Sequence, residues 1–332
     1  MTASTIPPSF WDQYPALFHP TRPPTALGGA GGLSGSELWR VESASGPLMV
    51  RAWPTSGPEP STLSRIHRWL SQASRLNILP IPLPNRIRTT WVEVQGRLWE
   101  LTPFLPGEAD LGRPPTDAHL ASMFRTLAAF HNELGSETIQ GPSPGLVARR
   151  DEVRRLIGGE FDRFQTALER WLDDPLAKLA SSWLGQARRI GPRLVAPLAQ
   201  AAVRSLTLQP CIRDVRPDHF LFEGDILTGL VDFGAMGIDT VATDLARLLG
   251  ETVGRAEGLR RIAFEAYETS RPITEVESAL LDNFEAANAL LGGARWVRRH
   301  FIDHRRSLDP DAVARGLSRA LARLEDYWNE PL

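Results

Sequence analysis

Cysteine and lysine are almost absent from this chain of 332 residues, in which Cys211 and Lys178 are the only examples. A single cysteine excludes an internal disulfide framework and a multi-cysteine metal site, and it is typical of a protein in the reducing cytoplasm, where we expect this one. Because lysine is so scarce, any role that usually calls for lysine must fall to arginine.

Long apolar runs are missing as well. No stretch of about 18 uncharged apolar residues occurs, so we expect no membrane span. The first residues, "MTASTIPPSFWDQYPALFHP", have neither a basic start nor an apolar core, and we expect no signal peptide. The net charge of -2 provides no overall attraction for nucleic acid, which we do not expect as a partner. An anionic ligand would need a local group of basic side chains.

The residues that are present indicate a β-rich part followed by a helical part. Residues 1–26 are rich in Pro, Ser and Thr and are expected to form an irregular lead-in. From Leu38 to Phe104 the pattern is strand-like, and it predicts an antiparallel sheet. The four segments that carry this pattern are "ELWRVES", "LMVRAW", "TTWVEV" and "RLWELTPF".

Helical spacing appears once among these strands and dominates after them. Residues 61–75 place apolar residues on one face and begin with Ser61 or Thr62 as a candidate cap. After "FLPGEAD" (104–110), helices are predicted over 117–134, 161–174 and 309–328. The sequence therefore predicts an α+β protein with a small β-rich lobe over 27–104 and a larger, mainly helical lobe over 105–332.

Within the helical part, "HFLF" and "ILTGLVDF" are two strand-like runs separated by the turn signal "EGD". This pattern predicts a β-hairpin. If Phe222 faces Gly229, an antiparallel register places His219 opposite Asp232. The open end of the hairpin is then expected to collect His219, Asp232 and, from the preceding loop, Asp214.

Two carboxylates held close together repel one another unless a cation lies between them. Mg²⁺ binds to one or two carboxylates and completes its shell with water and phosphate oxygens, and a nearby aspartate can accept a hydroxyl proton. Taken singly, each of these aspartates is better interpreted as a turn or cap residue. The glycine-rich "LGGAGGLSGSELWRV" (27–41), whose backbone N–H groups can approach phosphate, favours the chemical interpretation.

These segments resemble the aminoglycoside phosphotransferase and choline kinase group of the protein-kinase-like superfamily. "GGLSGSELWRV" is similar to its phosphate loop, "MVRAW" to its third strand and "LTPFLPGE" to its hinge. "IRDVRPDHFLF" resembles its catalytic loop, and "GLVDFGAMGIDTVATDLARLLG" its metal-binding segment. The resemblance implies a two-lobed protein-kinase-like fold with ATP and Mg²⁺ as cofactors.

The resemblance also implies roles for individual residues. Asp214 would be the catalytic base beside Arg213, and Asp232 the principal Mg²⁺ ligand. Arg51 would replace the lysine that pairs with nucleotide phosphates. The residues that would line the phosphates are Gly31, Gly32, Ser34, Gly35 and Ser36, and the hinge beside adenine would run from Thr102 to Phe104.

The chain departs from the family pattern at three places. Ile212 and Arg213 stand where the family usually has histidine and glycine, and Arg213 resembles protein kinases instead. His219 replaces the usual metal-binding asparagine, which points to Mn²⁺ as an alternative metal. A histidine at this place also resembles the lipopolysaccharide-core heptose kinases. Third, the 61–75 helix offers Arg51 no Glu or Asp.

The sequence thus predicts a phosphotransferase that moves the γ-phosphoryl group of ATP to a hydroxyl of a small molecule. The alternative is a pseudokinase that binds nucleotide and does not turn it over. A protein kinase is less favoured, because residues 235–250 offer no long activation segment. The acceptor stays open among aminoglycosides, amino sugars, lipid headgroups and heptoses.

Two further features have competing interpretations. In "ARWVRRHFIDHRR" (294–306), Arg295, Arg299 and Arg306 lie near one helical face, which is either solvated or binds an anionic substrate or RNA. Asp244 either caps the helix "TDLARLLG" or braces the catalytic loop.

Overall fold

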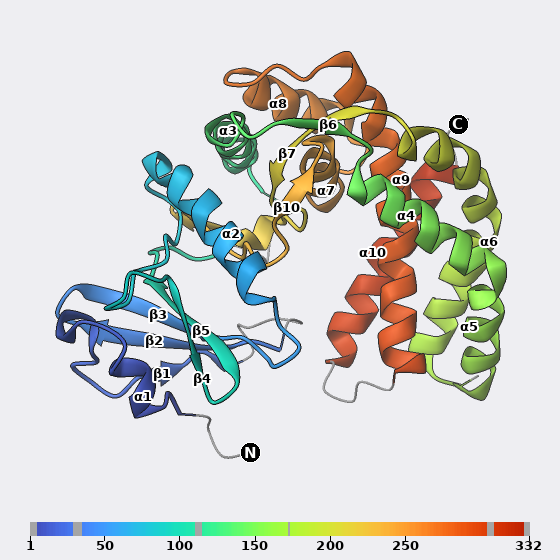
Figure 1. The fold of residues 1–332 in the computed structure, drawn as a ribbon. Coiled ribbons are helices and arrows are strands. Elements are labelled where there is room, and N and C mark those ends of the chain that lie inside the picture. Colours follow the sequence, from blue (N-terminus) through green and yellow to red (C-terminus); the bar gives the residue numbers. More distant parts are fainter. Residues whose placement is uncertain (1–4, 29–34, 110–114, 172, 304–308, 329–332) are drawn as a thin grey trace. The chain divides into compact units, whose positions relative to one another are not determined.

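The computed structural model describes the chain except for residues 1–4, 29–34, 110–114, 172, 304–308 and 329–332 (Figure 1). By its internal contacts the chain divides into two compact units. The first comprises residues 1–136 and 217–236, and the second comprises residues 137–216 and 237–332. The predicted boundary between 104 and 105 falls inside the first unit, and as a division between nucleotide-binding and substrate-binding lobes it stays a prediction.

The first unit contains the predicted antiparallel sheet, whose strand order is β1-β2-β3-β5-β4 (Figure 1). Trp39, Val50 and Leu101 lie side by side across three strands and are all buried. Gln95 and Gly96 both have positive φ, which suits the tight "QG" turn between the last two strands. The strands are β1 Thr25–Ala26, β2 Glu37–Ser43, β3 Gly46–Ala52, β4 Trp91–Val94 and β5 Arg97–Pro103.

The segment before the sheet is more ordered than the sequence predicted. It contains helix α1 (Pro8–Trp11) and the 3-10 turn η1 (Ala16–Phe18). Phe10 and Tyr14 are fully buried against the sheet, in a cluster where Trp39 and Trp99 stack with ring centroids 5.5 Å apart. Aromatic side chains bury enough apolar surface to order a short segment, and the Pro-rich composition conceals this.

Helix α2 (Pro60–Gln72) follows β3 and is succeeded by the 3-10 turn η3 (Ser74–Leu76). Its buried face includes Leu63, Ile66 and Leu70, as the spacing predicted. The expected cap was wrong, because Glu59 is the N-cap residue and no side chain caps the helix. Pro60 occupies the first turn, where its missing N–H is not needed.

Helix α3 (Asp117–Glu133) and a β-hairpin complete the first unit. The hairpin joins β8 (Phe220–Glu223) to β9 (Ile226–Leu230), after the 3-10 turn η6 (Pro217–His219). The hairpin was predicted correctly, but its register was not. Leu221 faces Gly229, and a bulge next to it makes Phe222 face Leu227.

The second unit is mainly helical, and a three-stranded sheet of order β10-β7-β6 lies within it (Figure 1). Helix α9 packs against α4, α6, α7 and α10. A Cβ at Gly293 would collide with the indole of the buried Trp183, so this glycine permits the close packing of α6 and α9. The strands are β6 Ile139–Gly141, β7 Leu206–Cys211 and β10 Gly237–Asp239.

The helices of the second unit cover two of the three long predictions, 161–174 and 309–328. The first becomes α5 followed by the 3-10 turn η5 (Glu169–Trp171), and the second becomes α10. The helices are α4 Pro144–Arg155, α5 Phe161–Leu168, α6 Pro175–Ala202, α7 Ala242–Thr252, α8 Glu257–Glu268, α9 Glu275–Val297 and α10 Pro310–Trp328, with π-helical turns at η4 (Leu156–Glu160) and η7 (Arg298–Ile302).

Among the described residues, no helix combines the length and the apolar character needed to cross a membrane. Cys211 is fully buried, and burial raises the pKa of its thiol well above the usual range. It therefore acts as the small buried residue that a lone cysteine usually is.

Candidate active site

Arg51 has an acidic partner after all, and this partner comes from the sheet. Glu100 on β5 lies directly opposite Arg51 on β3, and Arg51 Nε lies 3.6 Å from Glu100 Oε1. The guanidinium also lies over the Trp53 ring, 4.9 Å from its centroid, and its NH1 group is 4.0 Å from Asp232 Oδ1. Strand β5 thus supplies the carboxylate that α2 lacks.

Helix α2 contributes through His67. The imidazole Nε2 lies 2.6 Å from Glu100 Oε2, and Nδ1 lies 2.7 Å from the Thr90 hydroxyl. Burial alone would raise the pKa of Glu100, but the hydrogen bond and charge of His67 and the charge of Arg51 outweigh it, so the pKa lies below the usual range. Glu100 therefore stays ionised and holds Arg51 in place.

The sequence pattern did not identify Glu100 as the partner of Arg51. A signal was available, because both strands of the pair were predicted and an antiparallel register can be tested for opposite charges. The pairing register of β3 and β5, which places Arg51 opposite Glu100, was not known from the sequence.

We expect Glu100→Gln to raise the KM for ATP about tenfold, because Arg51 loses a charged partner worth about 1.5–3 kcal/mol. The isosteric amide retains the His67 contact, so the sheet should keep its structure. Steady-state kinetics with varied ATP measure the effect, and Glu93→Gln, an exposed carboxylate on β4, is the matched control. An unchanged KM would show that Arg51 needs no acidic partner.

The same variant should show a pH signature. A carboxyl whose pKa is lowered in the folded state contributes stability above its unfolded pKa and loses it as pH falls through the folded value. The stability difference between the wild type and Glu100→Gln should therefore shrink in acid, as thermal unfolding at several pH values would measure.

A pocket lies beside this network, within the first unit. Arg51, Glu100, Thr102 and Asp232 provide polar groups at its wall. The apolar part of the lining comes from Met49, Leu63, Ile66, Leu70, Val231 and Phe233.

Asp232 and His219 meet at the open end of the hairpin, as predicted despite the bulge. His219 Nε2 lies 3.5 Å from Asp232 Oδ2, and the backbone carbonyl of His219 accepts a hydrogen bond from Val231 N–H. The Asp232 side chain is 48% exposed, whereas His219 is buried. Asp232 has a φ of 65°, a left-handed conformation that is uncommon outside glycine and typical of functional sites.

The predicted phosphate loop and hinge are only partly visible. Gly31, Gly32 and Ser34 lie outside the described residues. Gly35 has a φ of 74°, which its missing side chain permits, and the adjoining Ser36 is buried.

At the hinge, Thr102 lines the pocket of the first unit. Phe104 does not belong to that lining, and its N–H donates to the carbonyl of Pro47 at 3.0 Å. Its backbone donor is therefore engaged within the sheet.

Asp214 and Arg213 belong to the second unit, on the loop after β7. Asp214 Oδ1 accepts a hydrogen bond from Arg247 NH2 at 3.0 Å, and its side chain is 46% exposed. Arg213 has a φ of 68°. The family's usual glycine adopts such a conformation without strain, so the arginine requires support from its surroundings.

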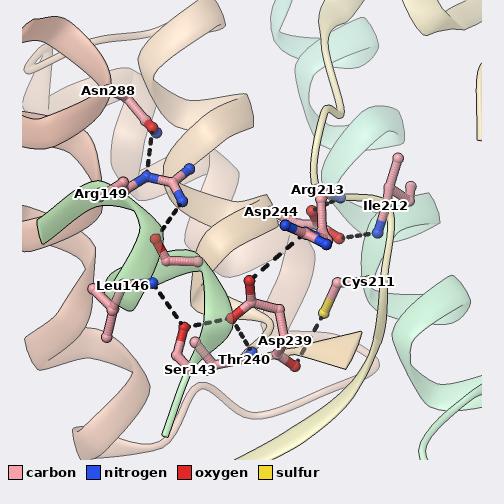
Figure 2. A network of polar contacts seen from close by, with 11 residues as sticks. Ser143, Leu146, Arg149, Cys211, Ile212, Arg213, Asp239, Thr240, Asp244 and Asn288 are labelled. Carbon is pink, nitrogen blue, oxygen red and sulfur yellow. Dashed lines mark hydrogen bonds and ion pairs between the residues drawn. The ribbon is translucent and has the colours of Figure 1, made fainter. Parts of the chain in front are cut away.

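That support comes from Asp244, at the first turn of α7. Its fully buried carboxylate accepts hydrogen bonds from the N–H groups of Ile212 and Arg213 at 2.7 and 2.6 Å (Figure 2). It does not cap α7, whose N-cap residue is Val241. Of the two roles considered for Asp244, bracing the catalytic loop is therefore the correct one.

Arg213 is held from the other side by Asp239 of β10. Its Nε lies 3.9 Å from Asp239 Oδ2, while Asp239 Oδ1 accepts from the Ser143 hydroxyl and from Thr240 N–H (Figure 2). Burial raises the pKa of Asp239 despite these favourable contacts. The loop that carries Asp214 is thus fixed by two buried aspartates.

A family model described as "Phosphotransferase enzyme family" matches residues 26–280. The chain belongs to this family. Both the family and the protein-kinase-like fold class predicted from the sequence are confirmed.

Relatives in sequence include homoserine kinases. That of Rhizobium rhizogenes is 26% identical over 223 residues, covering 66% of this chain and 63% of the relative. That of Polaromonas naphthalenivorans is 35% identical over 97 residues, covering 27% of this chain and 31% of the relative. The matched part of this chain thus spans less than two thirds of each of these relatives.

Solved structures show the same fold at low identity. An aminoglycoside phosphotransferase from Alicyclobacillus acidocaldarius has a TM-score of 0.61 at 18% identity, covering 98% of this chain and 97% of that one. An amicoumacin kinase in complex with AMP-PNP, Ca²⁺ and Ami has a TM-score of 0.63 at 13% identity, covering 94% of this chain and 91% of that one. At such identities the likeness establishes the fold alone.

Proposed function

We propose that this member of the family is an active phosphotransferase, which moves the γ-phosphoryl group of ATP to a hydroxyl of a small molecule. The observation that carries the proposal is the pocket of the first unit, where Arg51 is held by Glu100 and turned toward the exposed Asp232. A fixed cation and an accessible carboxylate in one pocket are what a nucleotide with its metal requires.

ATP would place its adenine against the apolar wall and its phosphates near Arg51. Arginine binds phosphate through a planar fork, so the position of the guanidinium matters more than that of a lysine ammonium. The Glu100 contact and the Trp53 ring both restrict it. Thr102 would lie at the adenine edge, and Gly31, Gly32, Ser34, Gly35 and Ser36 would line the phosphates, as the family resemblance implies.

The residues present fit a divalent cation. Asp232 offers a half-exposed carboxylate, and His219 Nε2 on its other side offers a nitrogen donor that suits Mn²⁺ as well as Mg²⁺. When bound, such an ion would neutralise the negative charge of the phosphates.

Asp214 would orient the acceptor hydroxyl and take its proton as the hydroxyl oxygen attacks the γ-phosphorus. The bond between that phosphorus and the β,γ-bridging oxygen would break, and ADP would leave with this oxygen. The Arg247 hydrogen bond fixes one carboxylate oxygen, and the other is left to face the acceptor. Arg213 would hold the loop through Asp239 and would not touch the reacting atoms.

The pseudokinase alternative is less well supported. It was suggested by the missing lysine and asparagine, but Arg51 has acquired a partner of its own in Glu100 and His219 adjoins Asp232. The homoserine kinase relatives also favour turnover. Because these relatives are homoserine kinases, homoserine belongs among the first acceptors to test.

The test is ATP consumption by the purified protein with Mg²⁺ or Mn²⁺ and hydroxyl acceptors that include homoserine, aminoglycosides, amino sugars and heptoses. Acceptor-dependent ADP formation, with the phosphorylated acceptor detected by mass spectrometry, is the expected result. Metal-dependent nucleotide binding without any turnover would support the pseudokinase instead, and absence of nucleotide binding would overturn both.

A further inference from the structure

Four arginines of the second unit interact electrostatically with one another, close to Asp214 and Asp239: Arg149 of α4, Arg213 of the catalytic loop, Arg247 of α7 and Arg295 of α9. Arg247 is paired with Asp214 and with Glu251, each at 3.0 Å, and Arg213 lies 3.9 Å from Asp239. Arg295 interacts electrostatically with Asp214, Glu152 and Arg247. Within the described chain, Arg149 and Arg295 are the two members of this cluster without an ion pair.

Arg149 is built into this cluster without a charged partner in hydrogen-bonding contact. Its Nε donates to Asn288 Oδ1 (Figure 2) and its NH1 to the Gly145 carbonyl, both at 3.0 Å. The guanidinium also lies over the Phe284 ring, 4.8 Å from its centroid. All three contacts are with neutral groups, and they fix the position of the guanidinium without an ion pair.

Arg295 has fewer polar contacts than Arg149. Among the described residues it forms no hydrogen bond and no ion pair within 4.0 Å, although it is only partly exposed. The nearby Glu152 is already bound by Arg298 at 3.2 Å and by Arg155 at 3.4 Å. A partly buried arginine is costly to keep unless something neutralises it.

The pKa values agree with mutual repulsion among these arginines. Burial is the main cause that lowers the pKa of Arg149 to about 10; Asp239 opposes the shift, and the charges of Arg295, Arg247 and Arg213 add to it. Burial and Arg247 also lower the pKa of Arg295. An anion placed among these groups would relieve the repulsion.

A second observation points to a ligand with acceptor atoms. Asn288 and Arg247 line a small pocket, which Glu285 and Asp326 also line and which does not include Arg149, Arg295 or Asp214. Within the described chain, Asn288 Nδ2 and Arg247 Nε are buried with no hydrogen-bond partner. Asn288 is only 7% exposed. A buried donor without a partner is rare in native proteins, and a bound group can supply what it lacks.

We propose that the acceptor of this phosphotransferase carries an anionic group, a carboxylate or a phosphate, next to its reactive hydroxyl, and that Arg295 and Arg149 bind this group. The inference rests on the proposed function, because Asp214 must be the base for the acceptor to lie here. Arginine forks bind both anions through paired hydrogen bonds. A polycationic aminoglycoside would be repelled by the same four side chains.

The test compares acceptors that differ only in the charged group. Homoserine is paired with its amide, and glycerol 3-phosphate with glycerol, while kanamycin represents the cationic class. The expected result is a kcat/KM at least about tenfold higher for one or both anionic members, since a charge-assisted pair contributes about 1.5–3 kcal/mol. The two pairs separate a carboxylate site from a phosphate site. Equal or better use of neutral or cationic acceptors would overturn the proposal.

Arg295→Gln should reduce the preference for the anionic member about 10- to 100-fold, and Arg295→Lys should reduce it less, because the charge remains and the fork is lost. Arg170→Gln, which removes the same charge from an exposed position on η5, is the matched control and should keep the preference. Equal losses for charged and neutral acceptors in Arg295→Gln would show a structural role and contradict the assignment.

Binding separates this proposal from the proposed function. Calorimetry with homoserine, glycerol 3-phosphate and inorganic phosphate, in the presence of a non-hydrolysable ATP analogue, should show saturable binding that Arg295→Gln weakens about tenfold or more. Such binding without turnover would support the anion site and refute the phosphotransferase. Turnover of uncharged acceptors without anion binding would support the phosphotransferase and refute the anion site.

Discussion

Asp214→Asn is expected to lower kcat by about 10²- to 10⁴-fold, the contribution that a positioned general base makes. Asparagine has nearly the same shape, and its amide oxygen can still accept the hydrogen bond that Arg247 NH2 makes to Asp214 at 3.0 Å. The catalytic loop should therefore keep its conformation while the proton acceptor is lost. Steady-state kinetics with saturating ATP and acceptor measure the effect.

The KM for ATP provides the diagnostic contrast. A group that acts only as the reaction proceeds affects kcat, whereas a group that binds substrate equally in both states affects KM. We therefore expect the KM for ATP to stay within about twofold for Asp214→Asn. Asp225→Asn, on the exposed turn of the hairpin, is the control and should leave both constants unchanged. A residual kcat close to that of the wild type would remove Asp214 from the mechanism.

Local patterns were sufficient to predict the elements of this fold. Alternating residues identified β2, β3, β4 and β5, and helical spacing identified α2, α3 and α10. The error in the β8–β9 hairpin concerns its pairing register, which one extra residue changes. The bulge between Leu221 and Phe222 shifts the hairpin register by one, and a pattern of alternating residues does not show where a strand accommodates an extra residue.

Those candidate site residues that lie close together in short, recognisable motifs were predictable from the sequence. "IRDVRPDHFLF" and "VDFG" carry Asp214, His219 and Asp232 within a few residues of a recognisable pattern. Glu100 was not predictable in this way, because its role depends on which residue of β3 it faces. The joining of Asp214 with the residues of the first unit stays a prediction.

The arginine cluster was harder still to foresee. Arg149, Arg247 and Arg295 come from three helices, and nothing in the spacing of their segments indicates that they meet. The sequence singled out Arg295 as part of a basic stretch, for which a solvated face was the common interpretation. The structure favours the other interpretation only because Arg295 shares its surroundings with Asp214 and Arg247.

Asp232→Asn is the second substitution with a large expected effect, a loss of turnover of about 10³-fold or more, since a metal that neutralises phosphate charge contributes several kcal/mol. Asparagine is the right replacement because Asp232 has a φ of 65°, and asparagine tolerates this left-handed conformation as well as aspartate does. The loss should therefore reflect chemistry and not backbone strain. Turnover titrated with Mg²⁺ and with Mn²⁺ measures it.

His219 stands where the family resemblance implies a metal-binding asparagine. If Nε2, 3.5 Å from Asp232 Oδ2, binds the metal, His219→Asn should replace a nitrogen donor by the oxygen donor that Mg²⁺ prefers. The ratio of Mn²⁺- to Mg²⁺-supported turnover should then fall in this variant. If His219 only orients Asp232, the ratio should stay constant while the thermal stability falls, because the imidazole is buried at 3% exposure. The two roles thus give opposite patterns in two measurements on the same variant.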